Sequence, residues 1–164
     1  MFRQIDSTRV LGRSAAPTCL GIAAAIVTLS SAMAGECPAG QMKAGAREAV
    51  SFPASGVTDT VLATIDLANE PVKLNDHLQR IRKLVVQPGG VVPWHSHTDR
   101  PALIYIIEGE IVEYASNCAV PIVHKAGDVR AETQGTSHWW KNLSDKPVTL
   151  LSFDILHDKG DHNM

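Results

Sequence analysis

The stretch that decides the fold is PWHSH (residues 93–97), which is followed further along the chain by GTSHWWKN (residues 135–142). Residues i and i+2 of a β-strand point to the same face of a sheet, at a rise of about 3.3 Å per residue. His95 and His97 are therefore expected on one face, and His138 comes from a second segment of the same kind. Three converging imidazoles predict a metal site inside a small β-barrel.

The first 34 residues have the layout of a secretory signal peptide. Three arginines precede the short apolar run LGIAAAIVTL (residues 20–29), which is too short to span a bilayer. Ala32-Met33-Ala34 then forms a small-x-small cleavage site before Gly35. An uncleaved membrane anchor is the alternative, but the position of that site favours cleavage. We therefore expect cleavage after Ala34, a periplasmic or secreted protein, and no membrane span after cleavage.

Cleavage would leave residues 35–164, enough for one domain around one core. The signal segment carries three arginines and one aspartate, so the 15 basic and 17 acidic residues of the chain fall to 12 and 16, a formal charge of −4. A mildly acidic domain without a basic cluster argues against nucleic-acid binding. The expected partner is a small-molecule ligand or substrate.

Two cysteines remain after the signal segment, Cys37 and Cys118. In an oxidising compartment such a pair favours one disulfide, whereas the alternative is two free thiols, one of them a possible metal ligand. A bridge would close a loop of about 80 residues, for which the chain-entropy model gives at most about 4.5 kcal/mol of stabilisation.

Closely spaced strand-like segments begin near residue 60, and Gly- or Pro-bearing turns such as Pro88-Gly89-Gly90 separate them. This pattern predicts an all-β sandwich or barrel over residues 57–157, with an irregular N-terminal arm over 35–56 and a polar tail over 158–164. A short helix is conceivable at 41–49. The predicted strands cover residues 60–67, 78–87, 91–97, 103–107, 111–115, 121–124, 129–132, 136–142 and 148–156.

Two motifs in this order resemble those of the cupin family. Its first motif runs G-x5-H-x-H-x3,4-E-x6-G, and its second runs G-x5-P-x-G-x2-H-x3-N. The matching residues are Gly89, His95, His97 and Gly109 for the first motif, and Gly127, Gly135, His138 and Asn142 for the second, with Thr133 in place of the proline. The resemblance covers about residues 78–157. It implies a single jelly-roll barrel (a double-stranded β-helix) and a homodimer as the common assembly.

The chain departs from the first motif at one ligand position. Counting back from Gly109 places the family's glutamate at Ala102, which cannot bind a metal. The resemblance then implies a three-histidine set, as in thiol dioxygenases and a diketone-cleaving cupin. Four nearby acids are candidates to replace the missing ligand: Asp99, Glu108, Glu110 and Glu113.

The metal is not identified by these residues, because neutral imidazole suits Fe, Zn, Mn, Ni or Cu. An alternative is a degenerate barrel in which hydrogen bonds satisfy the three histidines and no metal binds. Alternation predicts that Trp140, Ala102, Ile104 and Ile106 line the cavity. His124 falls at no ligand spacing and is expected at the surface or rim.

Three functions remain open at this point. The first is a metal-dependent oxygenase acting on a small anionic or chelating substrate. The second is a non-catalytic module that binds a small molecule or a metal. The third is an accessory protein with a vestigial site. A shared fold does not choose among them, because cupins include dioxygenases, isomerases, decarboxylases, sugar epimerases and storage proteins.

Overall fold

The computed structural model describes residues 35–157 of the 164-residue chain. The predicted signal peptide and C-terminal tail lie outside these residues. The described range holds strands and no helix, so no helix in it is long and apolar enough to cross a membrane. The strands are β1 (Ser55–Asp66), β2 (His77–Ser96), β3 (Ala102–Glu108), β4 (Glu110–Ala115), β5 (Ile122–Lys125), β6 (Val129–Glu132), β7 (Ser137–Lys141) and β8 (Val148–His157).

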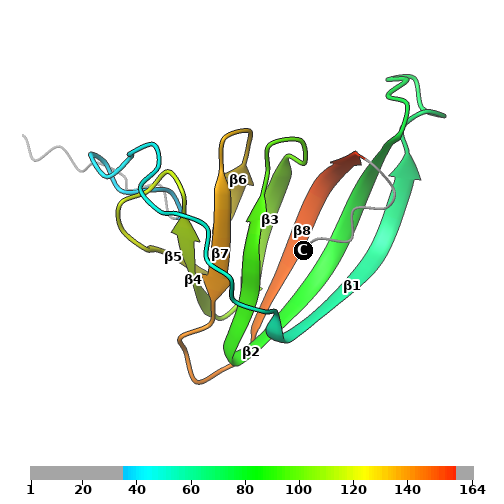
Figure 1. The fold of residues 1–164 in the computed structure, drawn as a ribbon. Helices are drawn as coiled ribbons and strands as arrows, with labels where there is room; N and C mark the ends of the chain where they lie inside the picture. Colours follow the sequence, from blue (N-terminus) through cyan, green and yellow to red (C-terminus); the bar gives the residue numbers. More distant parts are fainter. Residues whose placement is uncertain (1–34, 158–164) are drawn as a thin grey trace, which may run out of the picture. The chain divides into compact units, whose positions relative to one another are not determined.

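All strand pairs are antiparallel, and the sheet runs β5-β4-β7-β2-β8-β3-β6 with β1 paired to β2. Figure 1 shows this sheet curling around one interior. The turn between β5 and β6 also bonds to β3. The Ile106 N–H donates to Asp128 O at 3.0 Å, and the Gly127 N–H donates to Ile106 O at 2.9 Å. The prediction of an all-β jelly roll is confirmed.

The long strand β2 holds the fold together. Its first half lies between β1 and β8, and its second half pairs with β7. The two separate strands predicted at 78–87 and 91–97 are therefore one bent strand. Ser55 pairs with Val91 but Val57 pairs with Val86, so the glycines expected in a turn instead lie in a bulge of β2. This bend carries the chain from one half of the sheet to the other.

The N-terminal arm forms no helix, which corrects the prediction for residues 41–49. Its backbone bonds to the β4–β5 connection instead: the Lys43 N–H donates to Asn117 O and the Ala46 N–H donates to Ser116 O, at 3.0 and 2.8 Å. The predicted disulfide is present, with Cα atoms of Cys37 and Cys118 5.8 Å apart. These long-range bonds compete with helical hydrogen bonds and tie the arm to the sheet.

One face of the curled sheet forms the core. The turn between β3 and β4 shows how closely it packs: Gly109 has φ 88°, and a Cβ there would lie 2.9 Å from Val148 Cγ2. Only glycine adopts that backbone and tolerates that approach. The core comprises Leu84, Val86, Val92, Ala102, Ile104, Ile106, Ile111, Trp140, Val148 and Leu150.

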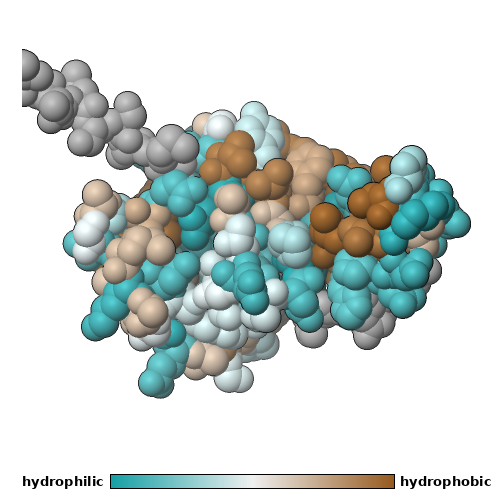
Figure 2. Space-filling view, turned by 90° about the horizontal axis from the view of Figure 1, so that it is seen from above, coloured by the Kyte–Doolittle hydropathy of each residue, from teal (hydrophilic) through white to brown (hydrophobic). Residues whose placement is uncertain are grey.

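Apolar side chains also reach the outer surface. Figure 2 shows them in patches among polar residues on the face seen from above. The exposed large apolar residues of β1 and β3 are Val61, Leu62, Ile65, Leu103, Tyr105 and Ile107. Such surface is compatible with association, and the homodimer stays a prediction.

Removing the disulfide should destabilise the protein strongly. The bridge closes a separation of 81 residues. We expect Cys37→Ala to lower the free energy of unfolding by about 2–5 kcal/mol in urea titrations. Reducing the native protein with dithiothreitol should give the same loss, and the variant should not respond to the reductant. Equal stability of the oxidised protein and the variant would contradict a structural bridge.

Candidate metal centre

Three imidazoles meet at the junction of β2 and β7. His95 lies near the end of β2 and pairs directly with His138 of β7. His97 lies just beyond β2, where its backbone N–H donates to Thr136 O at 2.9 Å. The Nε2 atoms are 3.2 Å apart for His95 and His97, and 3.0 Å from His138 in each case. The structure thus brings together the three histidines that the two motifs single out.

The outer nitrogen of each ring faces a group that can only accept a hydrogen bond. Nδ1 lies 2.9 Å from Pro93 O in His95, 2.8 Å from Arg100 O in His97, and 2.8 Å from Glu113 Oε1 in His138. Each Nδ1 must therefore carry a proton and donate it. In the neutral rings all three Nε2 lone pairs then point at one another, an arrangement that requires a cation between them.

The spacing of the three nitrogens suits a metal ion. Metal–imidazole bonds of about 2.0–2.1 Å place adjacent nitrogens about 2.9–3.4 Å apart, for angles between those of octahedral and tetrahedral sites. The observed 3.0–3.2 Å lies inside this range. His97 and His138 are buried, and His95 is half-buried. A divalent transition metal therefore fits the donor set in number, type and distance.

Two of the three rings are held neutral. Burial, and then the charge of His138, lower the pKa of His95 to about 2 and that of His97 to about 4. Burial lowers the pKa of His138 as well, but Glu132 and Glu113 outweigh it and raise that pKa to about 9. In the metal-free protein at neutral pH, a proton on His138 therefore supplies the positive charge that the three lone pairs require.

Carboxylates stand behind His138, on the side away from the other two histidines. Besides the bond to Glu113, His138 Nδ1 lies 3.2 Å from Glu132 Oε1, and both acids are fully buried. The guanidinium of Arg130 contacts Glu113 and Glu132 at 3.3 and 3.2 Å. His138, Glu113 and Glu132 could themselves hold a cation by distance. Arg130 already supplies that positive charge, so this group serves as support for His138.

His124 is not at the surface, which corrects the sequence prediction. Its side chain is fully buried because it alternates inward with Ile122 on β5. Its Nε2 lies 2.9 Å from Glu113 Oε2, and its ring stacks on Trp140 with centroids 4.4 Å apart. Glu113 therefore accepts from two histidines at once, one on each oxygen.

The missing glutamate is not replaced at the metal face. Ala102 points inward, and its neighbours across the sheet are Glu132 on β6 and Asp154 on β8. The Glu132 carboxylate reaches the outer nitrogen of His138 instead of its Nε2. Within residues 35–157, no acid or cysteine joins the group formed by the three histidines. Of the four candidate acids, only Glu113 touches one of the three rings, and it does so from behind.

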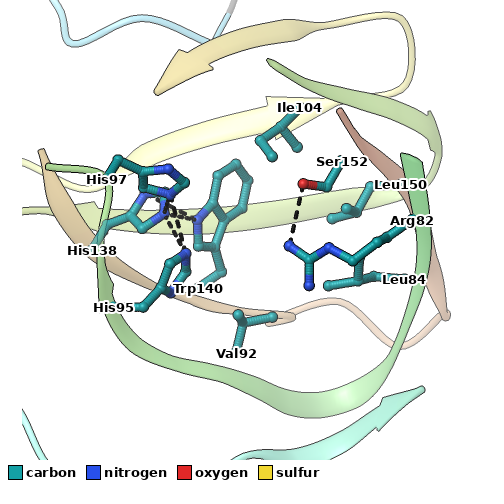
Figure 3. Close-up of a pocket in the computed structure, with 10 residues that line it drawn as sticks. All are labelled: Arg82, Leu84, Val92, His95, His97, Ile104, His138, Trp140, Leu150 and Ser152. Carbon is teal, nitrogen blue, oxygen red and sulfur yellow. Dashed lines mark hydrogen bonds between the residues drawn. The ribbon is translucent and has the colours of Figure 1, made fainter. Parts of the chain in front are cut away.

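A cavity of about 30 Å³ opens in front of the histidines, with room for about two water molecules. Trp140 and Ile104 line it, whereas Ala102 and Ile106 share the inward face but pack beside it in the core. The Trp140 indole N–H lies 3.1 Å and 3.3 Å from the two nitrogens of His138. Figure 3 shows the lining: Arg82, Leu84, Val92, His95, His97, Ile104, His138, Trp140, Leu150 and Ser152.

Arg82 is the charged residue at the other end of this cavity. Its guanidinium contacts Asp59 at 2.5 Å and Asp154 at 3.3 Å, and it donates to Ser152 Oγ at 3.4 Å. Asp154 also pairs with Arg80 at 2.8 Å. The two arginines and two aspartates balance in charge. Arg82 Nε is buried without a hydrogen-bond partner in the described part of the chain.

Sequence reasoning missed Glu132, Arg130 and Arg82. All three are buried charges on strands whose alternation puts them on the inward face with Ile104. The alternation could have indicated that these residues face inward. Charged residues are rarely buried unless they are paired, however, and their partners lie far away in the sequence.

The cupin domain family model matches residues 82–154. No curated protein sequence matches the chain. Solved structures that resemble it include the Schizosaccharomyces pombe Cnp3 cupin domain (16% identity, 63% of this chain and 66% of that chain, TM-score 0.48). KdgF from Halomonas sp. is also similar (15% identity, 65% of this chain and 83% of that chain, TM-score 0.48). An oxalate oxidase in complex with the substrate analogue glycolate is similar as well (20% identity, 65% of this chain and 57% of that chain, TM-score 0.47).

These structural similarities do not bear on activity, since all three TM-scores lie below 0.5. The family model carries the assignment, because its range includes all of both histidine motifs from His95 to Asn142. That range also holds β3 to β7 and most of β2 and β8, and it leaves out β1. Residues 82–154 of the chain form a cupin domain.

Proposed function

We propose that the protein binds a divalent transition metal through His95, His97 and His138. The observation that carries this proposal is the set of three Nε2 atoms, 3.0–3.2 Å apart, whose rings are each fixed by an acceptor at Nδ1. Rings held in this way have little freedom left to lose when they bind an ion. Support of this kind for a ligand is a recurrent feature of metal sites.

Such an ion, when bound, would supply Lewis-acid or redox chemistry at the coordination positions that three ligands leave open. The residues of the chain define the other requirements. Ile104, Leu150 and Trp140 give the cavity an apolar wall, and Arg82 with Ser152 offers donors at its far end. Neutral histidines leave the charge of the ion uncompensated, which favours an anionic, chelating head group. This supports a metal-dependent oxygenase acting on a small chelating substrate.

A non-catalytic binding module is the second candidate, and two observations favour it. The cavity is only about 30 Å³ in volume. No carboxylate joins the three histidines in the described residues, so a general base at the metal face is lacking there. A module that holds a metal or a small ligand needs neither feature.

Oxygen consumption separates the two candidates. The protein is loaded with Fe(II) without oxygen, then mixed with oxygen and a panel of small α-hydroxy and α-keto acids. An oxygenase should consume oxygen with at least one acid, and a His95→Ala control should not. Tight binding of iron and of an acid without oxygen uptake would exclude the oxygenase and support the non-catalytic binding module.

Metal binding should release about one proton, and release it from His138. At pH 8, a pKa of about 9 leaves that ring mostly protonated, whereas His95 and His97 are already neutral. Three ordinary histidines would together release only about 0.1 proton at this pH. Calorimetric titration with Zn²⁺ in buffers of different ionisation enthalpy measures the number. A value near zero would contradict the protonated His138.

The proposal includes export, with cleavage after Ala34 and a disulfide formed afterwards. The bond between Cys37 and Cys118 supports an oxidising compartment, because such bonds are rare in reducing ones. It also includes an arm over 35–56, a barrel over 57–157 and assembly as a homodimer. Sedimentation of the exported protein tests the dimer.

A further inference from the structure

His124 carries an unused hydrogen-bond acceptor deep in the protein. Its Nε2 faces the Glu113 carboxylate at 2.9 Å, so Nε2 holds the proton and donates it. With that proton on Nε2, Nδ1 presents its lone pair. It is buried and has no hydrogen-bond partner among residues 35–157. A buried acceptor left in this state is costly, and it requires a donor.

Gly35 is the residue placed to supply one. It is buried although it lies at the start of the arm. A Cβ built on it would stand 2.9 Å from His124 Nδ1 and 3.4 Å from Val129 O. Its φ is 85°, so a side chain here would be strained as well as crowded. The open Cβ side of Gly35 thus faces the unused acceptor and a carbonyl oxygen.

Cleavage after Ala34 would turn this glycine into an amino terminus. The nitrogen and the vacant Cβ position are both one bond from Cα, at about 1.5 Å. Once residue 34 is gone, rotation about the Cα–C bond of Gly35 can move the nitrogen into that position. An ammonium there would lie at 2.9 Å from His124 Nδ1, an ordinary hydrogen-bond length. A peptide nitrogen that still carries residue 34 does not have this freedom.

The local charge favours a cation. Three carboxylates contact the single guanidinium of Arg130: Glu36 at 2.6 Å, Glu132 at 3.2 Å and Glu113 at 3.3 Å. Glu36 is the next residue after Gly35, and its ion pair with Arg130 holds the arm against this cluster. Glu132 Oε2 is a second buried atom without a partner. Three carboxylates, of which Glu36 is exposed, here face two positive charges, Arg130 and the protonated His138, so an ammonium group would balance the third.

We propose that cleavage frees the α-ammonium of Gly35 to donate to His124 Nδ1, which completes a hydrogen-bond chain to the metal ligand His138. In that chain His124 Nε2 donates to Glu113 Oε2, and His138 Nδ1 donates to Glu113 Oε1. Maturation of the amino terminus then improves metal binding by fixing His138 from behind. The inference rests on the proposed cleavage site and metal site.

The test begins with the full-length chain, exported by a bacterial host and identified by intact mass. A mass corresponding to Gly35–Met164 is required, and any other terminus overturns the inference at this step. The protein is then acetylated with N-hydroxysuccinimidyl acetate at pH 7, folded and in urea. We expect the Gly35 amine to react at least about tenfold more slowly in the folded protein. Lys43, exposed on the same arm, is the internal control and should react alike in both states. Equal rates for Gly35 would overturn the anchoring.

A second measurement tests the link to His138. Inserting Ser-Gln after Ala34 moves the new terminus two residues away, and the same dipeptide added after Met164 is the matched control. We expect the first insertion to weaken Co²⁺ binding by about tenfold, as the loss of support for a ligand does. The control should bind normally. Unchanged binding after the first insertion overturns the link. Failure of the exported protein and of both insertion variants to bind Co²⁺ overturns the metal site, while the acetylation result still decides the anchoring.

Discussion

His95→Ala should abolish metal binding and leave the barrel folded. The variant removes one of three nitrogens that meet within 3.0–3.2 Å, so we expect Co²⁺ affinity to fall more than about 100-fold, beyond the effect of losing an outer-sphere partner. His95 is half-buried, and within residues 35–157 its Nδ1 bonds only to the Pro93 carbonyl. Its loss leaves no buried charge without a partner. Absorption bands of Co²⁺ and thermal unfolding measure the two effects.

The matched control is His77→Ala. This histidine lies on the same strand, but at its other end, where its ring faces His157 with centroids 4.7 Å apart. It should bind Co²⁺ like the wild type. Retention of the Co²⁺ spectrum in His95→Ala would mean that the ligands lie elsewhere. Loss of the spectrum in both variants would point to a general effect on folding.

His138→Ala is a poorer test, for a reason that only the structure reveals. Both the Glu113 and Glu132 carboxylates contact its ring, and both are fully buried. Removing the ring leaves Glu132 with Arg130, and Glu113 with Arg130 and His124. Breaking a buried network of this kind typically costs about 3–5 kcal/mol. Metal loss in this variant would therefore be mixed with loss of stability.

The fold and the three histidines were predictable from sequence because both depend on local pattern. Strand periodicity and the spacing of the two motifs place His95, His97 and His138 without knowledge of long-range pairing. The bulge in β2 was not predictable in this way. Pro88-Gly89-Gly90 has the composition of a turn, and only the pairing of Ser55 with Val91 keeps the chain extended through it.

The network behind His138 could not be predicted, because it depends on partners far apart in the chain. His124 and Glu113 are polar, and no local signal shows that each satisfies the other. Alternation along their strand places Arg130 and Glu132 on its inward face. Alternation alone does not predict that they are buried, because burying a charge without a partner is costly. Their burial makes sense only as a group, and the group exists only after the sheet curls.

Glu113→Gln should damage both stability and metal binding, although it changes a single atom type. Each Glu113 oxygen accepts from one histidine: Oε1 from His138 and Oε2 from His124. An amide has one oxygen, so its NH₂ group must face one of these two N–H groups. If it faces His138, the ring proton shifts to Nε2 and blocks the lone pair that would bind the metal. We therefore expect Co²⁺ affinity to fall by about 10–100-fold.

The stability effect follows from the pKa of Glu113. Burial raises that pKa, but hydrogen bonds from His124 and His138 outweigh it and hold it well below its ordinary value of 4.5. A depressed pKa means stability that is present above pH 4.5 and lost as the pH falls further. We expect the variant to lose about 3 kcal/mol at pH 7 and to show a flatter decline below pH 4.5 than the wild type.

Glu110→Gln provides the control, because it makes the same chemical change on the same strand. Glu110 is exposed, and its carboxylate contacts only the exposed amine of Lys125, at 3.4 Å, among the ion pairs of residues 35–157. Exposed pairs of this kind contribute at most about 1 kcal/mol. Urea titrations from pH 3 to pH 7, with Co²⁺ titrations at pH 7, compare the two variants. Equal behaviour of the two variants would mean that Glu113 does not support His138. A supporting carboxylate must affect both the decline of stability below pH 4.5 and the affinity for Co²⁺.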